Sequence, residues 1–178
     1  AFLDLHADDL ALLRELHGLV QDTDTFSDDF YEHILGFPQL RQLVKDDGTV
    51  QRLKHSQAAY FRSLSSGNYD GAYIRDRLRV GLVHQRIGLE PKWYIGAYRK
   101  YVAGMFDLLW KQFHAEPERF RAMFNSVLKV VCLDMGLALD TYAHADRRSV
   151  VQHQNYLEQV IGGMPAGLIV TDASGRIR

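Results

Sequence analysis

The sequence lacks the features that nucleic-acid-binding and disulfide-rich proteins require. Its 21 Lys and Arg residues are balanced by 22 Asp and Glu residues, so the formal net charge is -1 and no long basic run is available to bind phosphates. Cys132 is the one cysteine, which excludes an intrachain disulfide, and no CxxCH motif for covalent cofactor attachment is present. We therefore expect no nucleic acid partner and a reducing, cytoplasmic location.

Segments and motifs of several other protein classes are also missing. No apolar run approaches the roughly 18 residues of a membrane span, and residues 1–9 carry acids where a signal peptide would be basic and then apolar. The HExxH, paired CxxC, Walker, GxSxG and GxGxxG motifs are absent, which excludes zinc hydrolases, P-loop nucleotide binding and serine esterases of those types. Because the chain begins without Met and stops at Gly175-Arg176-Ile177-Arg178, we expect it to be a piece of a longer protein.

Prolines are scarce, and three of the four lie where a helix would begin or break: Pro38, Pro91 and Pro117. With 47% hydrophobic and 24% charged residues, the composition is that of a globular protein. Apolar residues recur every three or four positions, which predicts an all-α fold. Helices are expected from Asp8, after Thr25 or Ser27, after residues 46–48, over 71–87, over 91–113 and from Pro117 onward.

The last two predicted helices are long and apolar over most of their circumference. A helix of this kind needs burial on more than one side, so we expect one side to face the core and the other a second subunit. Past Tyr142 the sequence turns polar, and Val150 and Leu157 are seven residues apart, which favours a helical signalling linker. Residues 167–172 are strand-like because they are rich in β-branched side chains. The predicted parts are a domain at 1–145, a helical linker at 146–163 and the truncated start of a second domain at 164–178.

His84 stands out among the eight histidines because of its neighbours. It lies among apolar side chains, with Gly81 three residues before it and Gly88 four residues after it. On a helix these offsets place both glycines on the face of the imidazole, so a flat, bulky group such as haem could approach the backbone there. A histidine packed in the core without a ligand explains the same local pattern.

The string VHQRIGLEPKWYIGAY at residues 83–98, together with Phe30-Tyr31 and the spacing between them, resembles the globin-coupled sensors. The resemblance covers residues from about 8 to 145 and implies a globin-like fold around a non-covalent haem b. It further implies that His84 is the proximal ligand of the haem iron and that Tyr31 stands on the distal side. Leu53 falls where many oxygen-storage globins have a distal histidine, and Ser56 follows one helical turn later.

These implied roles have a physical basis. Dioxygen on ferrous haem carries partial negative charge, so a buried Tyr31 hydroxyl could donate to it, a contact worth about 1 to 3 kcal/mol. Leu53 cannot donate, which leaves Tyr31 as the main discriminator against carbon monoxide and Ser56 as a second donor or a water anchor. The resemblance places Tyr94 on the proximal side, where it could follow iron-ligand movement through a hydrogen bond to His84.

The family also implies a homodimer in which the two long C-terminal helices of each copy form a four-helix bundle. Residues 146–161 would then pass a shift of a helix to an output domain. Residues 164–172 resemble the opening of a PAS-type domain, which favours a diguanylate cyclase output over a chemotaxis receptor. We therefore predict a haem-based sensor of dioxygen, with carbon monoxide or nitric oxide as further ligands, that is not itself an enzyme and acts on a C-terminal effector domain in cis.

Two other functions fit parts of the sequence. A haem-free, globin-like interaction domain of the stressosome type would keep the fold and the dimer, but the complete signature around His84 argues against it. A haem enzyme, such as a gas dioxygenase or a peroxidase-like globin, would need an electron supply, and no flavin or nicotinamide motif is present.

Overall fold

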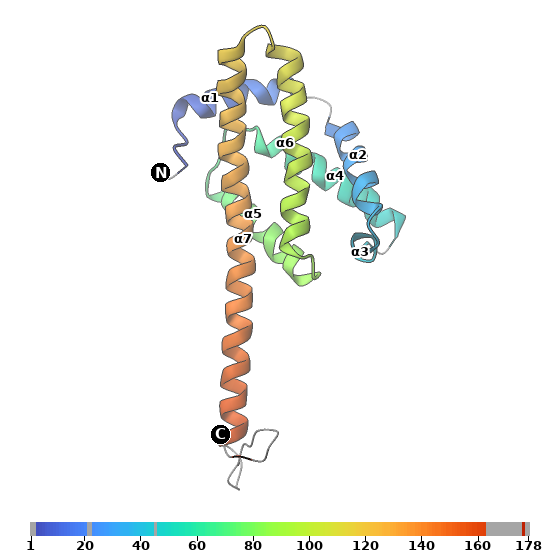
Figure 1. Cartoon of the computed structure of the whole chain (residues 1–178), viewed down its shortest axis with the longest axis vertical. Helices are drawn as coiled ribbons and strands as arrows, with labels where there is room; N and C mark the ends of the chain where they lie inside the picture. Colours follow the sequence, from blue (N-terminus) through green and yellow to red (C-terminus); the bar gives the residue numbers. More distant parts are fainter. Residues whose placement is uncertain (1–2, 21–22, 45, 163–175, 177–178) are drawn as a thin grey trace. The chain divides into compact units, whose positions relative to one another are not determined.

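The computed structural model describes residues 3–20, 23–44, 46–162 and 176, and within these ranges the regular structure is helical, with no strand. The predicted strand and the predicted domain start at 164–178 lie outside the described residues, apart from Arg176. The described residues form seven helices, which Figure 1 labels in chain order. They are α1 (Ala7–Leu19), α2 (Thr23–Leu35), α3 (Pro38–Arg41), α4 (Asp47–Leu64), α5 (Gly71–Arg86), α6 (Pro91–Phe113) and α7 (Pro117–Gly162).

Local sequence signals set most of these helix ends. The Asp46 carboxylate accepts a hydrogen bond from the Thr49 backbone N–H at 2.6 Å, and Asp70 accepts from Ala72 and Tyr73 at 2.9 and 3.0 Å. Such caps satisfy N–H groups that have no partner inside the helix. Helix α6 spans 91–113 as predicted, whereas α2 begins at Thr23, two residues before the earlier of its predicted caps.

The chain divides into two compact units, Ala1–Tyr142 and Ala143–Arg178. Helix α7 contributes to both units and continues to Gly162 without a break. The polar stretch after Tyr142 therefore does not end the helix, because Asp, Arg and Gln are compatible with a helix interior. The cavity and the polar network described below belong to the first unit.

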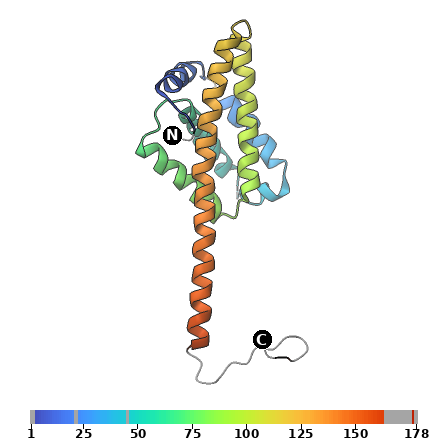
Figure 2. The same ribbon diagram turned by 60° about the vertical axis from the view of Figure 1, so that its left-hand side comes forward.

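The first unit is built around one apolar core. Helix α6 and the part of α7 up to Tyr142 run side by side (Figure 2), and the ring of Phe106 lies 5.2 Å from Phe120 and 5.4 Å from Phe124. Helices α1 and α4 add their buried faces to the same core. The largest fully buried apolar side chains are Leu13, Leu16, Leu64, Leu109, Met123, Val127 and Val130.

One face of α6 and α7 remains apolar and exposed. Trp110 is 54% exposed, Ile95 44%, Phe106 40% and Leu128 36%, and a groove between the two helices is lined by the last three of these residues. The surplus of apolar surface predicted for the two long helices is thus present. The predicted second subunit against this face stays a prediction.

The stretch Pro117–Ala145 of α7 is long and apolar enough to cross a membrane by length and composition alone. This test tolerates charged residues, and Lys129 and Asp134 interrupt the apolar residues of the stretch, so it is not the uninterrupted apolar run whose absence was noted in the sequence. Core helices pass the same test, and Met123, Val127 and Val130 of this stretch are buried in the core of the first unit.

Candidate functional site

A cavity lies among α2, α3, α4, α5 and α6. Its wall is mostly apolar and aromatic, which is typical of sites for cofactors and small ligands. The apolar lining residues are Phe30, Ile34, Leu40, Phe61, Val80, Leu89, Trp93 and Ala97. The polar lining residues are Tyr31, Gln57, Tyr60, His84, Tyr94 and Tyr98.

His84 is the one imidazole among these lining residues, and it lies in the last turn of α5. Its Nδ1 atom is buried and has no hydrogen-bond partner among the residues that the structure describes. Burial lowers the pKa of the imidazole, so the ring stays neutral and keeps a lone pair that can bind a metal. A buried polar atom without a hydrogen-bond partner costs about 1 to 3 kcal/mol of stability. A bound group that orders the imidazole would explain why the protein keeps a buried histidine here.

A haem fits this donor set. Within the described ranges no three His, Cys, Asp or Glu side chains gather closely enough to hold a metal ion by themselves. A single neutral imidazole in an aromatic cavity is sufficient for haem, because the porphyrin supplies the in-plane ligands of the iron. The alternative of a histidine packed in the core leaves the orphaned Nδ1 atom unexplained.

Tyr31 reaches the same cavity from α2. The side chain is buried, and its ring meets that of Phe30 edge to face at a centroid distance of 5.5 Å. Burial raises the pKa of the Tyr31 hydroxyl to about 12, so the group is protonated at neutral pH and can donate a hydrogen bond. The structure thus brings the two residues that the sequence singled out most strongly, His84 and Tyr31, to one cavity.

Tyr94 lies beside His84, with 5.2 Å between the ring centroids. Its hydroxyl is within hydrogen-bond distance of the hydroxyls of Tyr98 at 3.0 Å and Tyr60 at 3.1 Å. These two contacts connect Tyr94 to a larger polar network behind the cavity wall.

Leu53 and Ser56 do not line the cavity. Leu53 is 36% exposed, and the exposed Ser56 hydroxyl donates to the Arg52 carbonyl oxygen at 3.0 Å within α4.

The residues of α4 that line the cavity are Gln57, Tyr60 and Phe61, which lie one to two turns farther along the helix from Leu53. Gln57 and Tyr60 continue from Val50 and Leu53 at spacings of three and four residues, so they share one stripe of the helix. Nothing in the sequence of this stripe indicated which turn would meet the cavity.

Gly81 also does not line the cavity. A Cβ atom at this position would lie 2.1 Å from the Thr141 hydroxyl and 3.1 Å from the Ala138 backbone. The absence of a side chain therefore lets α5 pack closely against α7 and leaves no room for a flat group. Gly88 follows α5 with φ +76°, so it turns the chain and does not share a helix face with His84.

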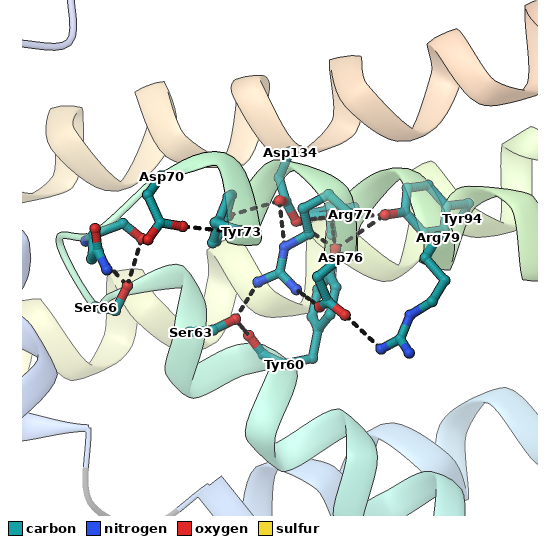
Figure 3. A network of polar contacts seen from close by, with 12 residues as sticks. Tyr60, Ser63, Ser66, Asp70, Tyr73, Asp76, Arg77, Arg79, Tyr94 and Asp134 are labelled. Carbon is teal, nitrogen blue, oxygen red and sulfur yellow. Dashed lines mark hydrogen bonds and ion pairs between the residues drawn. The ribbon is translucent and has the colours of Figure 1, made fainter.

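A buried ion pair lies behind the cavity and was not anticipated from the sequence (Figure 3). Asp134 of α7 and Arg77 of α5 are 0% and 1% exposed, and the Arg77 Nε donates to Asp134 Oδ1 at 2.8 Å. Tyr73 also donates to Oδ1, at 2.7 Å, while Tyr98 donates to Oδ2 at 2.5 Å and Tyr60 donates to the same oxygen. The sequence feature that could have indicated this ion pair is a carboxylate, Asp134, among the apolar residues of α7.

The surroundings of the ion pair keep its tyrosines protonated. Burial raises the pKa values of Tyr60, Tyr73 and Tyr98, and the negative charge of Asp134 raises them further. The Arg77 guanidinium lies over the Tyr60 ring at 3.9 Å and over the Tyr73 ring at 4.3 Å. The network is therefore a set of neutral hydroxyl donors around one paired carboxylate.

Comparisons with known proteins agree with this geometry. Residues 1–148 match a family model described as Protoglobin. A heme-based aerotactic transducer, HemAT, of Halobacterium salinarum is 32% identical over 152 residues, which cover 80% of this chain and 31% of the relative. The chain thus spans less than a third of the length of this curated relative.

The fold has a solved counterpart. The globin domain of a Geobacter sulfurreducens globin-coupled sensor matches with a TM-score of 0.75 and 26% sequence identity, over 79% of this chain and 93% of that chain. The all-α, globin-like fold predicted from the sequence is therefore confirmed.

Proposed function

Because this chain belongs to the protoglobin family, we propose that it is the haem-binding, oxygen-sensing domain of a longer signalling protein. The observation that carries the proposal is the position of His84, whose buried Nδ1 atom has no partner in an aromatic cavity that also holds Tyr31. The relative from Halobacterium, a heme-based aerotactic transducer, supports the same function. The chain itself acts as a sensor and not as an enzyme.

Two side chains carry the binding chemistry. Haem b would supply, when bound, an iron able to bind dioxygen, carbon monoxide or nitric oxide. His84 would hold the iron through a neutral imidazole nitrogen, and the surrounding aromatic side chains exclude water from the cavity. Tyr31 places a protonated hydroxyl in the cavity, which favours dioxygen because that ligand gains negative charge and carbon monoxide gains much less.

The remaining proposals concern the binding partners of the chain and its location in the cell. The exposed apolar face of α6 and α7 supports a homodimer through these two helices, since such a face is costly to leave in water. The effector is a C-terminal domain in cis, and a diguanylate cyclase is the output we favour over a chemotaxis receptor. We place the protein in the cytoplasm.

The test is the absorption spectrum of the full chain, reconstituted with haem, in its ferrous, oxygen-bound and carbon-monoxide-bound forms. We expect a stable oxy spectrum for the wild-type chain and loss of the axially ligated ferrous spectrum in His84→Ala. His55→Ala is the matched control, because His55 is exposed on α4 and does not line the cavity. A chain that takes up no haem would refute the proposal, and a normal spectrum from His84→Ala would show that another residue binds the iron.

A further inference from the structure

We propose that Gln57 is a second hydrogen-bond donor toward the gas in the cavity, and that together with Tyr31 it favours dioxygen over carbon monoxide. The inference rests on the haem-binding function proposed above. It gives Gln57 of α4 the part that the sequence resemblance gave to Ser56, whose exposed hydroxyl is bonded within α4 and does not line the cavity.

Two tyrosines of the cavity wall have no proton to offer a ligand. The Asp134 carboxylate is paired with Arg77 at 2.8 Å, so it is ionised and can only accept hydrogen bonds. Tyr60 and Tyr98 each have one hydroxyl proton, and each donates it to Oδ2 of Asp134. Both hydroxyls are therefore used outside the cavity.

The third tyrosine of the network, Tyr94, is used in the same way. Its hydroxyl lies 3.0 Å from the Tyr98 oxygen and 3.1 Å from the Tyr60 oxygen. In both contacts Tyr94 alone has a proton to give, because the other two protons go to the carboxylate. Tyr94 therefore donates toward the network and away from a cavity ligand.

The donors of the wall that remain are Tyr31 and Gln57. Hydrogen bonds from the side chains of Lys92 and Trp93 lower the pKa of the Glu90 carboxyl, so the indole N–H of Trp93 is used there. Within the described part of the chain, neither the Tyr31 hydroxyl nor the half-buried Gln57 carboxamide makes a hydrogen bond. The carboxamide has two N–H donors and does not titrate, so it can donate at any pH at which the protein is folded.

The register of α4 directs Gln57 to the cavity. Gln57, Tyr60 and Phe61 all line it, and spacings of three and four residues place them on one face of the helix. Tyr31 reaches the same cavity from α2, and His84 reaches it from α5. The two free donors thus come from helices other than the one that carries the imidazole.

A role in the fold alone does not explain a carboxamide at this position. An amide that leaves water without gaining a hydrogen bond destabilises a protein, and the other α4 residues of the wall are aromatic. Dioxygen gains partial negative charge when it binds a ferrous haem, and carbon monoxide gains much less, so an N–H donor in the cavity favours dioxygen. Gln57 therefore adds selectivity for the gas at a cost in stability.

The experiment compares Gln57→Leu with Ser56→Ala and with the control His55→Leu in the full, haem-loaded chain. Dioxygen should dissociate about 2- to 13-fold faster from Gln57→Leu, which is the rate change for the loss of one net hydrogen bond. Carbon monoxide dissociation and the association rates of both gases should change little. Ser56→Ala and His55→Leu should behave as the wild-type chain, because both residues are exposed on α4 and do not line the cavity.

A spectroscopic measurement reports the donor directly. A donor beside bound carbon monoxide lowers the C–O stretching frequency, so this infrared band should move to higher frequency in Gln57→Leu. If Gln57→Leu does not fold, Gln57→Glu decides at about pH 8, because it keeps the shape of the side chain and its ionised carboxylate has no N–H donor.

Three results would overturn the inference: an unchanged dioxygen dissociation rate in Gln57→Leu, a larger effect in Ser56→Ala, or equal acceleration of the entry of both gases. The last result would make Gln57 a steric barrier. If the wild-type chain takes up no haem, the proposed function itself fails. If it takes up haem and Gln57→Leu releases dioxygen at the wild-type rate, only the role of Gln57 fails.

A further measurement does not need haem. The melting temperature of haem-free Gln57→Leu should equal or exceed that of the haem-free wild-type chain, because the carboxamide has no partner among the described residues. A lower melting temperature would show that the carboxamide stabilises the fold and would count against the inference.

Discussion

At the level of single residues, the hydroxyl of Tyr31 has the two properties that a discriminating donor needs. It lies in the cavity with His84, and burial raises its pKa to about 12. A hydroxyl with this pKa stays protonated across the range in which the protein would work, so its ability to donate does not depend on pH there.

Replacing this donor gives the first prediction. Tyr31→Phe should speed dioxygen dissociation by about 5- to 150-fold, because the lost hydrogen bond is worth about 1 to 3 kcal/mol, while carbon monoxide dissociation changes little. Stopped-flow measurements of both gases check this, with Tyr156→Phe as a control at an exposed position outside the cavity.

The dioxygen dissociation rate can also be measured as a function of pH. Because the folded pKa of Tyr31 lies near 12, the wild-type dissociation rate should be flat between pH 6 and about 10 and should rise only as the hydroxyl ionises above that range. An unchanged dioxygen rate in Tyr31→Phe, or a wild-type rate that changes near neutral pH, would remove the residue from its proposed role.

At the level of helices, the contact of α5 with α7 depends on Gly81. The position has no room for a methyl group, since a Cβ atom would meet the Thr141 hydroxyl at 2.1 Å and Ala138 backbone atoms at 3.1 Å. Backbone atoms cannot move aside as a flexible side chain can, so the two helices would have to separate.

The second prediction tests this contact. Gly81→Ala should lower the free energy of unfolding by about 1 to 3 kcal/mol through overpacking, and the melting temperature by about 2 to 4 °C for each kcal/mol. Gly96→Ala is the matched control, because Gly96 lies in α6 with no atom within 4 Å of a Cβ atom there. It should leave stability unchanged or raise it by up to about 1 kcal/mol through better helix propensity. Equal melting temperatures for the two variants would contradict the assignment.

At the level of the whole molecule, the exposed apolar face of α6 and α7 is the surface through which we expect two copies of the chain to form a dimer. Side chains such as Ile95, Phe106 and Leu128 line one groove, and their exposed fractions lie between 36 and 44%. A second copy of the same face would remove this surface from water, and a two-fold interface makes each patch its own partner.

The third prediction concerns this assembly. The double variant Ile95→Glu with Phe106→Glu should convert the dimer to a monomer in sedimentation experiments while haem uptake persists, because neither residue lines the cavity. Leu82→Glu is the control: Leu82 is 40% exposed on α5, as Phe106 is on α6, but it lies outside the groove. A wild-type chain that is monomeric, or a variant that stays dimeric, would contradict the proposed interface.

The sequence by itself determined most of the helices and the two main cavity residues. Three- and four-residue apolar spacing, residues 46–48 before α4, and Pro91 are local signals, and a local signal can be interpreted without the rest of the chain. His84 was identified from the string at residues 83–98, and Tyr31 from Phe30-Tyr31 and its spacing to that string, through the resemblance to a known family. The strand predicted at residues 167–172 remains a prediction, because these residues lie outside the part of the chain that the structure describes.

Tertiary structure alone decided which side chains meet. The apolar stripe of α4 contains Leu53, Gln57 and Tyr60, yet only the last two face the cavity, because the position of the helix against its neighbours selects the turn. The space beside Gly81 was filled by α7, a helix that begins 36 residues later in the chain. The carboxylate of Asp134 finds Tyr60, Arg77 and Tyr98 at sequence separations of 36 to 74 residues, and hydrogen bonds over such separations exist only once the helices have packed.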